Sequence, residues 1–107
     1  MYKLSYHVPE SHLEATKQAL FTAGAGRVGN YDQCCWQVKG TGQFRPQAGS
    51  QPFLGQPGTL EHTEEYLVEM VCAKAHIEAA VAALQQSHPY EEPAFAVLPM
   101  VDVDLQS

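Results

Sequence analysis

Four segments of alternating apolar and polar residues, separated by two helical segments in a fixed order, most constrain what this chain can fold into. Strict alternation, as in Tyr2, Leu4, Tyr6 and Val8, is typical of a strand with one buried face. Apolar residues spaced three or four apart are typical of a helix that packs through one stripe. The sequence predicts strands over about 2–8, 34–39, 66–72 and 94–101, and helices over about 13–23 and 77–84.

The order strand, helix, strand, strand, helix, strand is that of the ferredoxin-like split βαβ arrangement. The 107 residues suit one domain over 1–107, and an apolar share of 45% suits a packed core. The predicted fold class is therefore α+β, with an antiparallel sheet and two helices on one face.

The expected helix ends rest on local signals. Ser11-x-x-Glu14 is a capping-box pattern, which predicts the start of the first helix, and Gly24 and Gly26 predict its end. The run from Gly24 to Gly29 also matches GxGxxG, but it follows a helix instead of opening one, so we expect a turn and no NAD site. His88, which precedes a proline, is expected to end the second helix.

The last two strands carry apolar residues on both faces. Two helices cover only one face of a sheet, so the other face needs a second partner surface, and oligomerisation is the simplest source of one. The residues concerned are Phe95, Val97 and Val101 on one side, Ala94, Ala96, Leu98 and Met100 on the other, and Leu67 and Val71 in the preceding strand.

Charge and composition argue against several partners. A net charge of −6, with six scattered Lys and Arg residues, opposes nucleic-acid binding. No apolar run approaches the ~20 residues of a membrane helix, and the start lacks a signal-peptide stretch. Cys34, Cys35 and Cys72 form neither a CxxC nor a zinc spacing and are expected to be reduced thiols. We expect a cytoplasmic protein with no nucleic-acid or membrane partner.

A long segment between the middle two strands, at about 40–63, is rich in Gly, Pro and Gln. Loops of this length inside a compact domain are usually functional or mobile. Gly40 and Gly42 expose backbone N–H groups, and Arg45 offers a planar fork for a carboxylate or phosphate, so these three are candidate ligand-binding residues for a small anion. The alternative is a flexible connection with a solvated arginine.

The second candidate site follows the second helix, where residues 88–93 read His-Pro-Tyr-Glu-Glu-Pro. His88, Glu91 and Glu92 are the candidate metal ligands, since an imidazole and two carboxylates lie close together between prolines that restrict the backbone. The alternative is a structural turn in which His88 caps the helix and Tyr90 packs on the sheet.

Four motifs in order resemble the YqfO family: residues 6–10, 24–32, 42–46 and 88–93. The chain is similar to the inserted domain of longer YqfO proteins, here standing alone, and that domain is similar in fold to PII signalling proteins and to CutA. The resemblance implies a homotrimer, a ligand-responsive loop at 40–63 and, from CutA, binding of copper or another divalent metal. Longer YqfO proteins also carry a two-metal, hydrolase-like body whose ligand segments this chain lacks.

These observations favour a non-catalytic binding or regulatory module with a small anion or divalent metal as ligand. One alternative is a metal-assisted, hydrolase-type activity in which His88 and Glu91 or Glu92 take part. Another is a scaffold that binds only other proteins. No local signature of nucleophilic catalysis supports an enzyme.

Overall fold

The computed structural model describes residues 1–101 and contains four strands and two α-helices, the latter each preceded by a short 3-10 turn. In chain order the elements are β1 (Tyr2–Pro9), η1 (Glu10–His12), α1 (Leu13–Thr22), β2 (Trp36–Phe44), β3 (Glu61–Cys72), η2 (Lys74–His76), α2 (Ile77–Ser87) and β4 (Phe95–Pro99).

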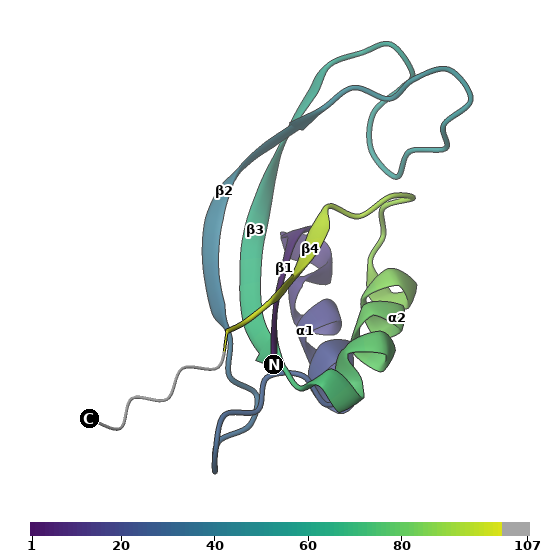
Figure 1. Cartoon of the computed structure of the whole chain (residues 1–107). Helices are drawn as coiled ribbons and strands as arrows, with labels where there is room; N and C mark the ends of the chain where they lie inside the picture. Colours follow the sequence, from purple (N-terminus) through teal and green to yellow (C-terminus); the bar gives the residue numbers. More distant parts are fainter. Residues whose placement is uncertain (102–107) are drawn as a thin grey trace.

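The four strands form one antiparallel sheet in the order β2-β3-β1-β4. Figure 1 shows α1 and α2 together on one side of this sheet, and the β2–β3 hairpin extending beyond the other strands. The predicted ferredoxin-like α+β fold is therefore confirmed. None of the helices in the described part of the chain has the length and apolar character needed to cross a membrane.

The core lies between the sheet and the two helices. Leu4, Tyr6 and Val8 of β1 are fully buried, as their alternation predicts, and β3 adds three further core residues. Burying an aliphatic side chain of this size stabilises the fold by about 1.5–3 kcal/mol. The core residues of β3 and the helices are Val68, Met70, Cys72, Leu13, Leu20, Ala80 and Leu84.

One polar chain crosses this core. The Tyr6 hydroxyl donates to Oγ1 of Thr16 at 3.0 Å, and the Thr16 hydroxyl donates back to the carbonyl oxygens of His12 and Leu13, each at 2.9 Å. Burial raises the pKa of Tyr6 to about 12. The Tyr6 hydroxyl is therefore neutral and hydrogen-bonded, so its burial costs little free energy.

The start of α1 differs from the predicted capping box. Residues 10–12 form the turn η1, and no side chain caps the first helical N–H groups. Ser11 Oγ lies instead 2.8 Å from Nδ1 of His12. The end of the helix is as predicted: Gly24 has a φ of 109° in the left-handed region that glycine tolerates, and the ring of His76 occupies the space where a side chain would lie.

The β2–β3 hairpin is longer than the sequence pattern predicts. Pairing continues to Phe44 opposite Glu61, so the connecting loop spans 45–60 and the expected bounds of about 40–63 are too wide. Gly40 and Gly42 therefore belong to β2, where ladder pairing overrides the weak strand preference of glycine. At the other end of the chain, β4 is shorter than expected and stops at Pro99.

The sheet face opposite the helices is open. Cross-strand partners share a face, so the pairings of Trp36 with Glu69 and of Val38 with Leu67 place all four there. Trp36 is 68% exposed and Leu98 is 55% exposed. Large apolar side chains therefore remain uncovered on this face, as the apolar positions of the sequence predict.

Candidate functional site

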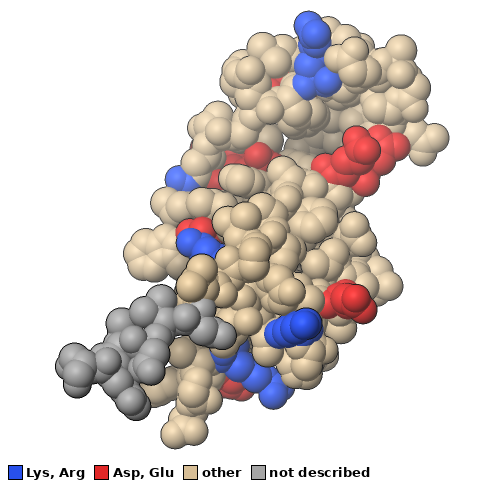
Figure 2. Space-filling view, viewed as in Figure 1, with Lys and Arg blue, Asp and Glu red and all other residues tan. Residues whose placement is uncertain are grey.

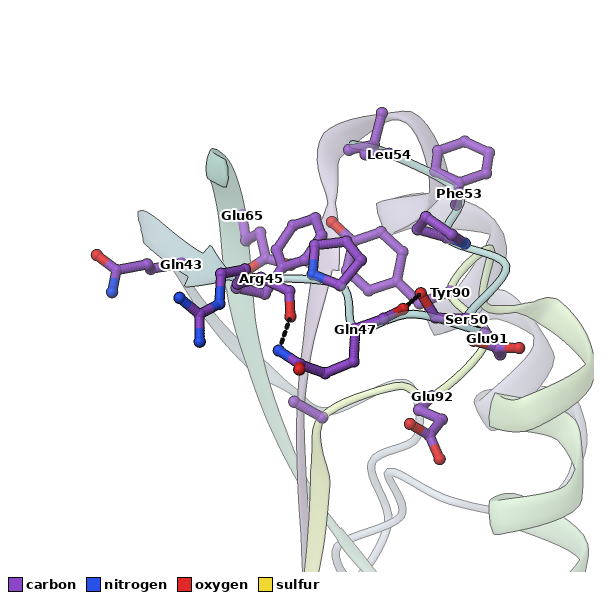
Figure 3. Close-up of a pocket in the computed structure, with 14 residues that line it drawn as sticks. Gln43, Arg45, Gln47, Ser50, Phe53, Leu54, Glu65, Tyr90, Glu91 and Glu92 are labelled. Carbon is purple, nitrogen blue, oxygen red and sulfur yellow. Dashed lines mark hydrogen bonds between the residues drawn. The ribbon is translucent and has the colours of Figure 1, made fainter. Parts of the chain in front are cut away.

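A cavity of about 370 Å³ lies at the tip of the molecule, between the end of the β2–β3 hairpin and the turn from α2 to β4 (Figure 3). This volume falls within the range of small-molecule sites. The lining residues are Gln43, Phe44, Arg45, Pro46, Gln47, Ser50, Pro52, Phe53, Leu54, Glu65, Tyr90, Glu91, Glu92 and Ala94.

The loop 45–60 forms one wall and is held by its own hydrogen bonds. Gly58 N–H donates to the carbonyl of Pro46 at 2.7 Å, and the Ser50 hydroxyl donates to the carbonyl of Gln47 at 2.7 Å. Gly49, Gly55 and Gly58 supply the positive φ values that these reversals require. The loop therefore has a defined shape, and Figure 1 shows it curling back toward the α2–β4 turn.

His88 holds the opposite wall in place. Its Nε2 lies 2.6 Å from the carbonyl oxygen of His7, and its Nδ1 accepts the N–H of Tyr90 at 3.1 Å. These partners require the neutral ring with the proton on Nε2. Burial lowers the pKa of His88 below its usual value of 6.5, which also favours the neutral ring.

Three aromatic rings contribute much of the apolar lining. The Tyr90 ring centroid lies 6.1 Å from that of Phe44 and 6.2 Å from that of Phe53, with a tilt of 45° in each pair. Phe53 also contacts the ring of His12 edge-on at 5.7 Å. Tyr90 therefore joins the turn, the hairpin and the loop at one point.

Within residues 1–101 the buried Tyr90 hydroxyl makes no well-formed hydrogen bond, although the side chains of Glu65 and Thr63 lie beside it. Burial, and next the nearby Glu65 carboxylate, raise the pKa of Tyr90 to about 12. A buried hydroxyl that is incompletely hydrogen-bonded is costly in a folded protein.

Glu65 reaches this position because Gly42 has no side chain. Any Cβ at position 42 would collide with Oε1 of Glu65, whereas a Cβ at Gly40 would meet nothing within 4 Å. The glycines of β2 thus differ in role: Gly42 gives the Glu65 carboxylate room to lie across the hairpin, and Gly40 makes no comparable contact.

The charges around the cavity are mostly negative. Glu65, Glu91 and Glu92 line it together with Arg45. Glu91 accepts the N–H of Gln51 at 3.2 Å and so ties the loop to the turn. In Figure 3 the Arg45 guanidinium extends to the side away from Glu91 and Glu92, and Figure 2 shows an acidic patch just below the tip.

The structure brings together part of each predicted site. Arg45, Glu91 and Glu92 line one cavity, although they come from different motifs. Gly40 and Gly42 lie in β2 outside that lining, and His88 lies behind Tyr90 with both ring nitrogens engaged. Within residues 1–101, no three His, Cys, Asp or Glu side chains are placed to hold a metal ion.

Glu65, Phe44 and Phe53 were not predicted as site residues. Glu65 and Phe44 lie on parts of β3 and β2 outside the predicted strands, where the sequence shows no apolar alternation that would have placed them. Phe53 lies in the loop, where no periodic pattern exists to place it.

Known proteins of similar sequence and structure show what this chain resembles. A Halalkalibacterium halodurans protein named GTP cyclohydrolase 1 type 2 homolog is 43% identical over 102 residues, which are 95% of this chain and 27% of that protein. A Bacillus cereus protein related to NIF3 has 37% identity and a TM-score of 0.81, over 94% of this chain and 26% of that chain. The chain spans about a quarter of these relatives. The expected similarity to longer YqfO-type proteins thus holds for one segment of them.

The CutA1 divalent ion tolerance protein family matches residues 56–106. CutA1 from Pyrococcus horikoshii superposes with a TM-score of 0.69 at 15% identity, over 98% of this chain and 88% of CutA1. The fold is that of CutA1. At this level of identity the likeness concerns the fold alone.

Proposed function

We propose that this domain is a non-catalytic binding or regulatory module of the cytoplasm, and that the tip cavity is its ligand site. The observation that carries the proposal is a cavity of about 370 Å³ whose lining combines three aromatic rings with three carboxylates. Apolar rings with a few polar groups around one concave space are typical of a small-molecule site. The three free cysteines suit a reducing compartment.

The cavity is also suited to regulation because its two walls are separate segments. The loop 45–60 and the turn after α2 meet through the Gln51–Glu91 hydrogen bond and the Phe53–Tyr90 contact. A ligand that binds only the closed arrangement shifts the population toward it. The closed loop then presents a different surface to a partner protein or to a neighbouring domain.

Of the two ligand classes expected from the sequence, neither fits the cavity without change. An anion in the cavity would share the lining with three carboxylates, and a metal ion would lack His88 as a ligand. The hydrolase-type alternative draws support from the name of the longer relatives, GTP cyclohydrolase 1 type 2 homolog. Within residues 1–101, no three His, Cys, Asp or Glu side chains are grouped as metal ligands, so the binding module is the function that we favour.

We further propose that the domain self-associates, as a homotrimer, through the open sheet face. Support comes from the exposed side chains of Trp36, Val38 and Leu98 and from the fold shared with CutA1. Exposed apolar side chains on an uncovered sheet face are a common mark of an interface.

A thermal-shift screen of nucleotides, phosphate, metal chlorides and organic cations tests the ligand proposal. Any ligand of the folded state raises the melting temperature by mass action. Ala94→Phe fills the cavity from its lining, and Ala79→Phe on the exposed side of α2 is the matched control. We expect a ligand to raise the melting temperature of the parent and of Ala79→Phe, and to leave that of Ala94→Phe unchanged. Shifts that survive in both variants would place the ligand elsewhere.

A further inference from the structure

Resting on the proposed function, we propose that the tip cavity selects a flat aromatic cation of the amidine type, with Glu65 as the carboxylate that receives its N–H groups. This class is a planar ring that carries two adjacent N–H donors on a positively charged group.

The charges of the lining favour a cation over an anion. The lining contains three carboxylates and one guanidinium. Among the residues that the structure describes, Arg45 makes no ion pair with these carboxylates. Glu91 has one oxygen engaged by Gln51 N–H but keeps its negative charge, so all three carboxylates contribute to the local potential. Opposite charges a few ångströms apart attract most strongly where protein replaces water.

The aromatic rings favour a planar ligand. Phe44 and Phe53 both lie about 6 Å from the Tyr90 ring, with the same 45° tilt. Such rings present both faces and edges toward the space that they border, and they attract a cation over a face at distances up to about 6 Å. An organic cation uses this apolar surface, whereas a hydrated metal ion does not.

Glu65 and Tyr90 provide the polar end of the site. The Glu65 carboxylate is placed over Gly42 and beside the buried Tyr90 hydroxyl. A carboxylate accepts two parallel N–H donors in a bidentate pair, which is the pattern that an amidinium group presents. The Tyr90 hydroxyl, which is shielded from the cavity, then donates its own proton to Glu65 and helps to hold the carboxylate in place.

Three probes of one shape separate the possibilities: benzamidine, benzamide and benzoate share a ring and differ in charge. Calorimetric titration of the whole chain at pH 7.5 should give the order benzamidine, benzamide, benzoate from tightest to weakest. Glu65→Gln should weaken benzamidine by about tenfold, which corresponds to the loss of one charged hydrogen bond. Glu64→Gln is the matched control, because the Glu64 carboxylate is next in sequence but lies on the other face of β3, where it pairs with Lys39.

Melting temperatures near that of the parent establish that both variants fold. Benzoate binding tightest, or equal benzamidine affinity in Glu65→Gln and the parent, would overturn the amidine assignment while leaving a cavity that binds ligands. Failure of all three probes at millimolar concentration would also overturn it, and the Ala94→Phe screen would then decide separately whether the cavity binds anything.

Discussion

His88 and Tyr90 are joined twice: Nδ1 of His88 accepts the Tyr90 N–H at 3.1 Å, and their rings lie 4.9 Å apart. Through Nε2 the same imidazole reaches the carbonyl of His7 on β1. The ring therefore fixes the turn that carries Tyr90 into the cavity. This arrangement combines the two interpretations of the motif at 88–93, since a structural turn builds one wall of the candidate site.

The buried His88 should make the fold sensitive to acid. Burial lowers its pKa below 6.5, so the folded protein favours the neutral ring; the stabilisation is present above about pH 6.5 and is lost as pH falls through the folded pKa. His88→Gln should lose roughly 1–3 kcal/mol at pH 7.5 and show a flatter melting profile between pH 7.5 and 5. The exposed His62→Gln is the control, and a parent-like slope in His88→Gln would contradict this account.

Gly42→Ala should affect binding more than folding. The new methyl group displaces the end of a flexible glutamate, which costs little stability but moves the Glu65 carboxylate. We expect a melting temperature close to that of the parent and several-fold weaker benzamidine binding by calorimetry. Gly40→Ala, two residues away on the same face, should leave the melting temperature and the benzamidine affinity unchanged. An equal loss of affinity in the two variants would show that a stiffer strand, and not the displaced Glu65 carboxylate, weakens binding.

Tyr6 should make the fold sensitive to alkali. Its pKa of about 12 in the fold exceeds the ordinary value of 10, so the stabilisation is present below about pH 10 and is lost as pH rises toward 12. Tyr6→Phe should lose about 1 kcal/mol near neutral pH through the missing bond to Thr16. Its disadvantage relative to the parent should shrink between pH 10 and 12 in urea unfolding, whereas a constant difference would exclude Tyr6 as the titrating group.

Leu98→Asp should disrupt self-association. An unpaired carboxylate in an apolar interface costs several kcal/mol, and Leu98 is 55% exposed on the open face of the sheet. Light scattering should give a trimer for the parent and a smaller species for this variant. Val28→Asp, at an exposed apolar position outside the four strands, should keep the parental mass; a parental mass for Leu98→Asp would place the interface elsewhere.

Much of the fold follows from the sequence because its signals are local. The alternation of Leu4, Tyr6 and Val8 identifies the buried face of β1, and Gly24 marks the end of α1. The Ser11 capping box fails because the chain enters α1 through a 3-10 turn that tertiary packing favours. The hairpin extension over Gly40 and Gly42 depends on partners more than twenty residues away, which no local pattern reveals.

The candidate site is less predictable for the same reason. Arg45, Glu91 and Glu92 are found from motif chemistry, but only the fold brings the loop 45–60 against the α2–β4 turn. The sequence suggests His88 as a metal ligand because it cannot show what the imidazole bonds to. Both hydrogen-bond partners of the ring are backbone groups, which every residue carries and which therefore leave no pattern in the sequence.

The central claim is that the tip cavity binds a small molecule, and an amide chemical-shift titration of the labelled protein with benzamidine tests it most directly. The account predicts saturable shifts confined to the loop 45–60, the neighbourhood of Glu65 and the turn 88–94, all with one dissociation constant. Shifts centred on Trp36 and Leu98 of the open sheet face, or no shifts at millimolar benzamidine, would contradict it.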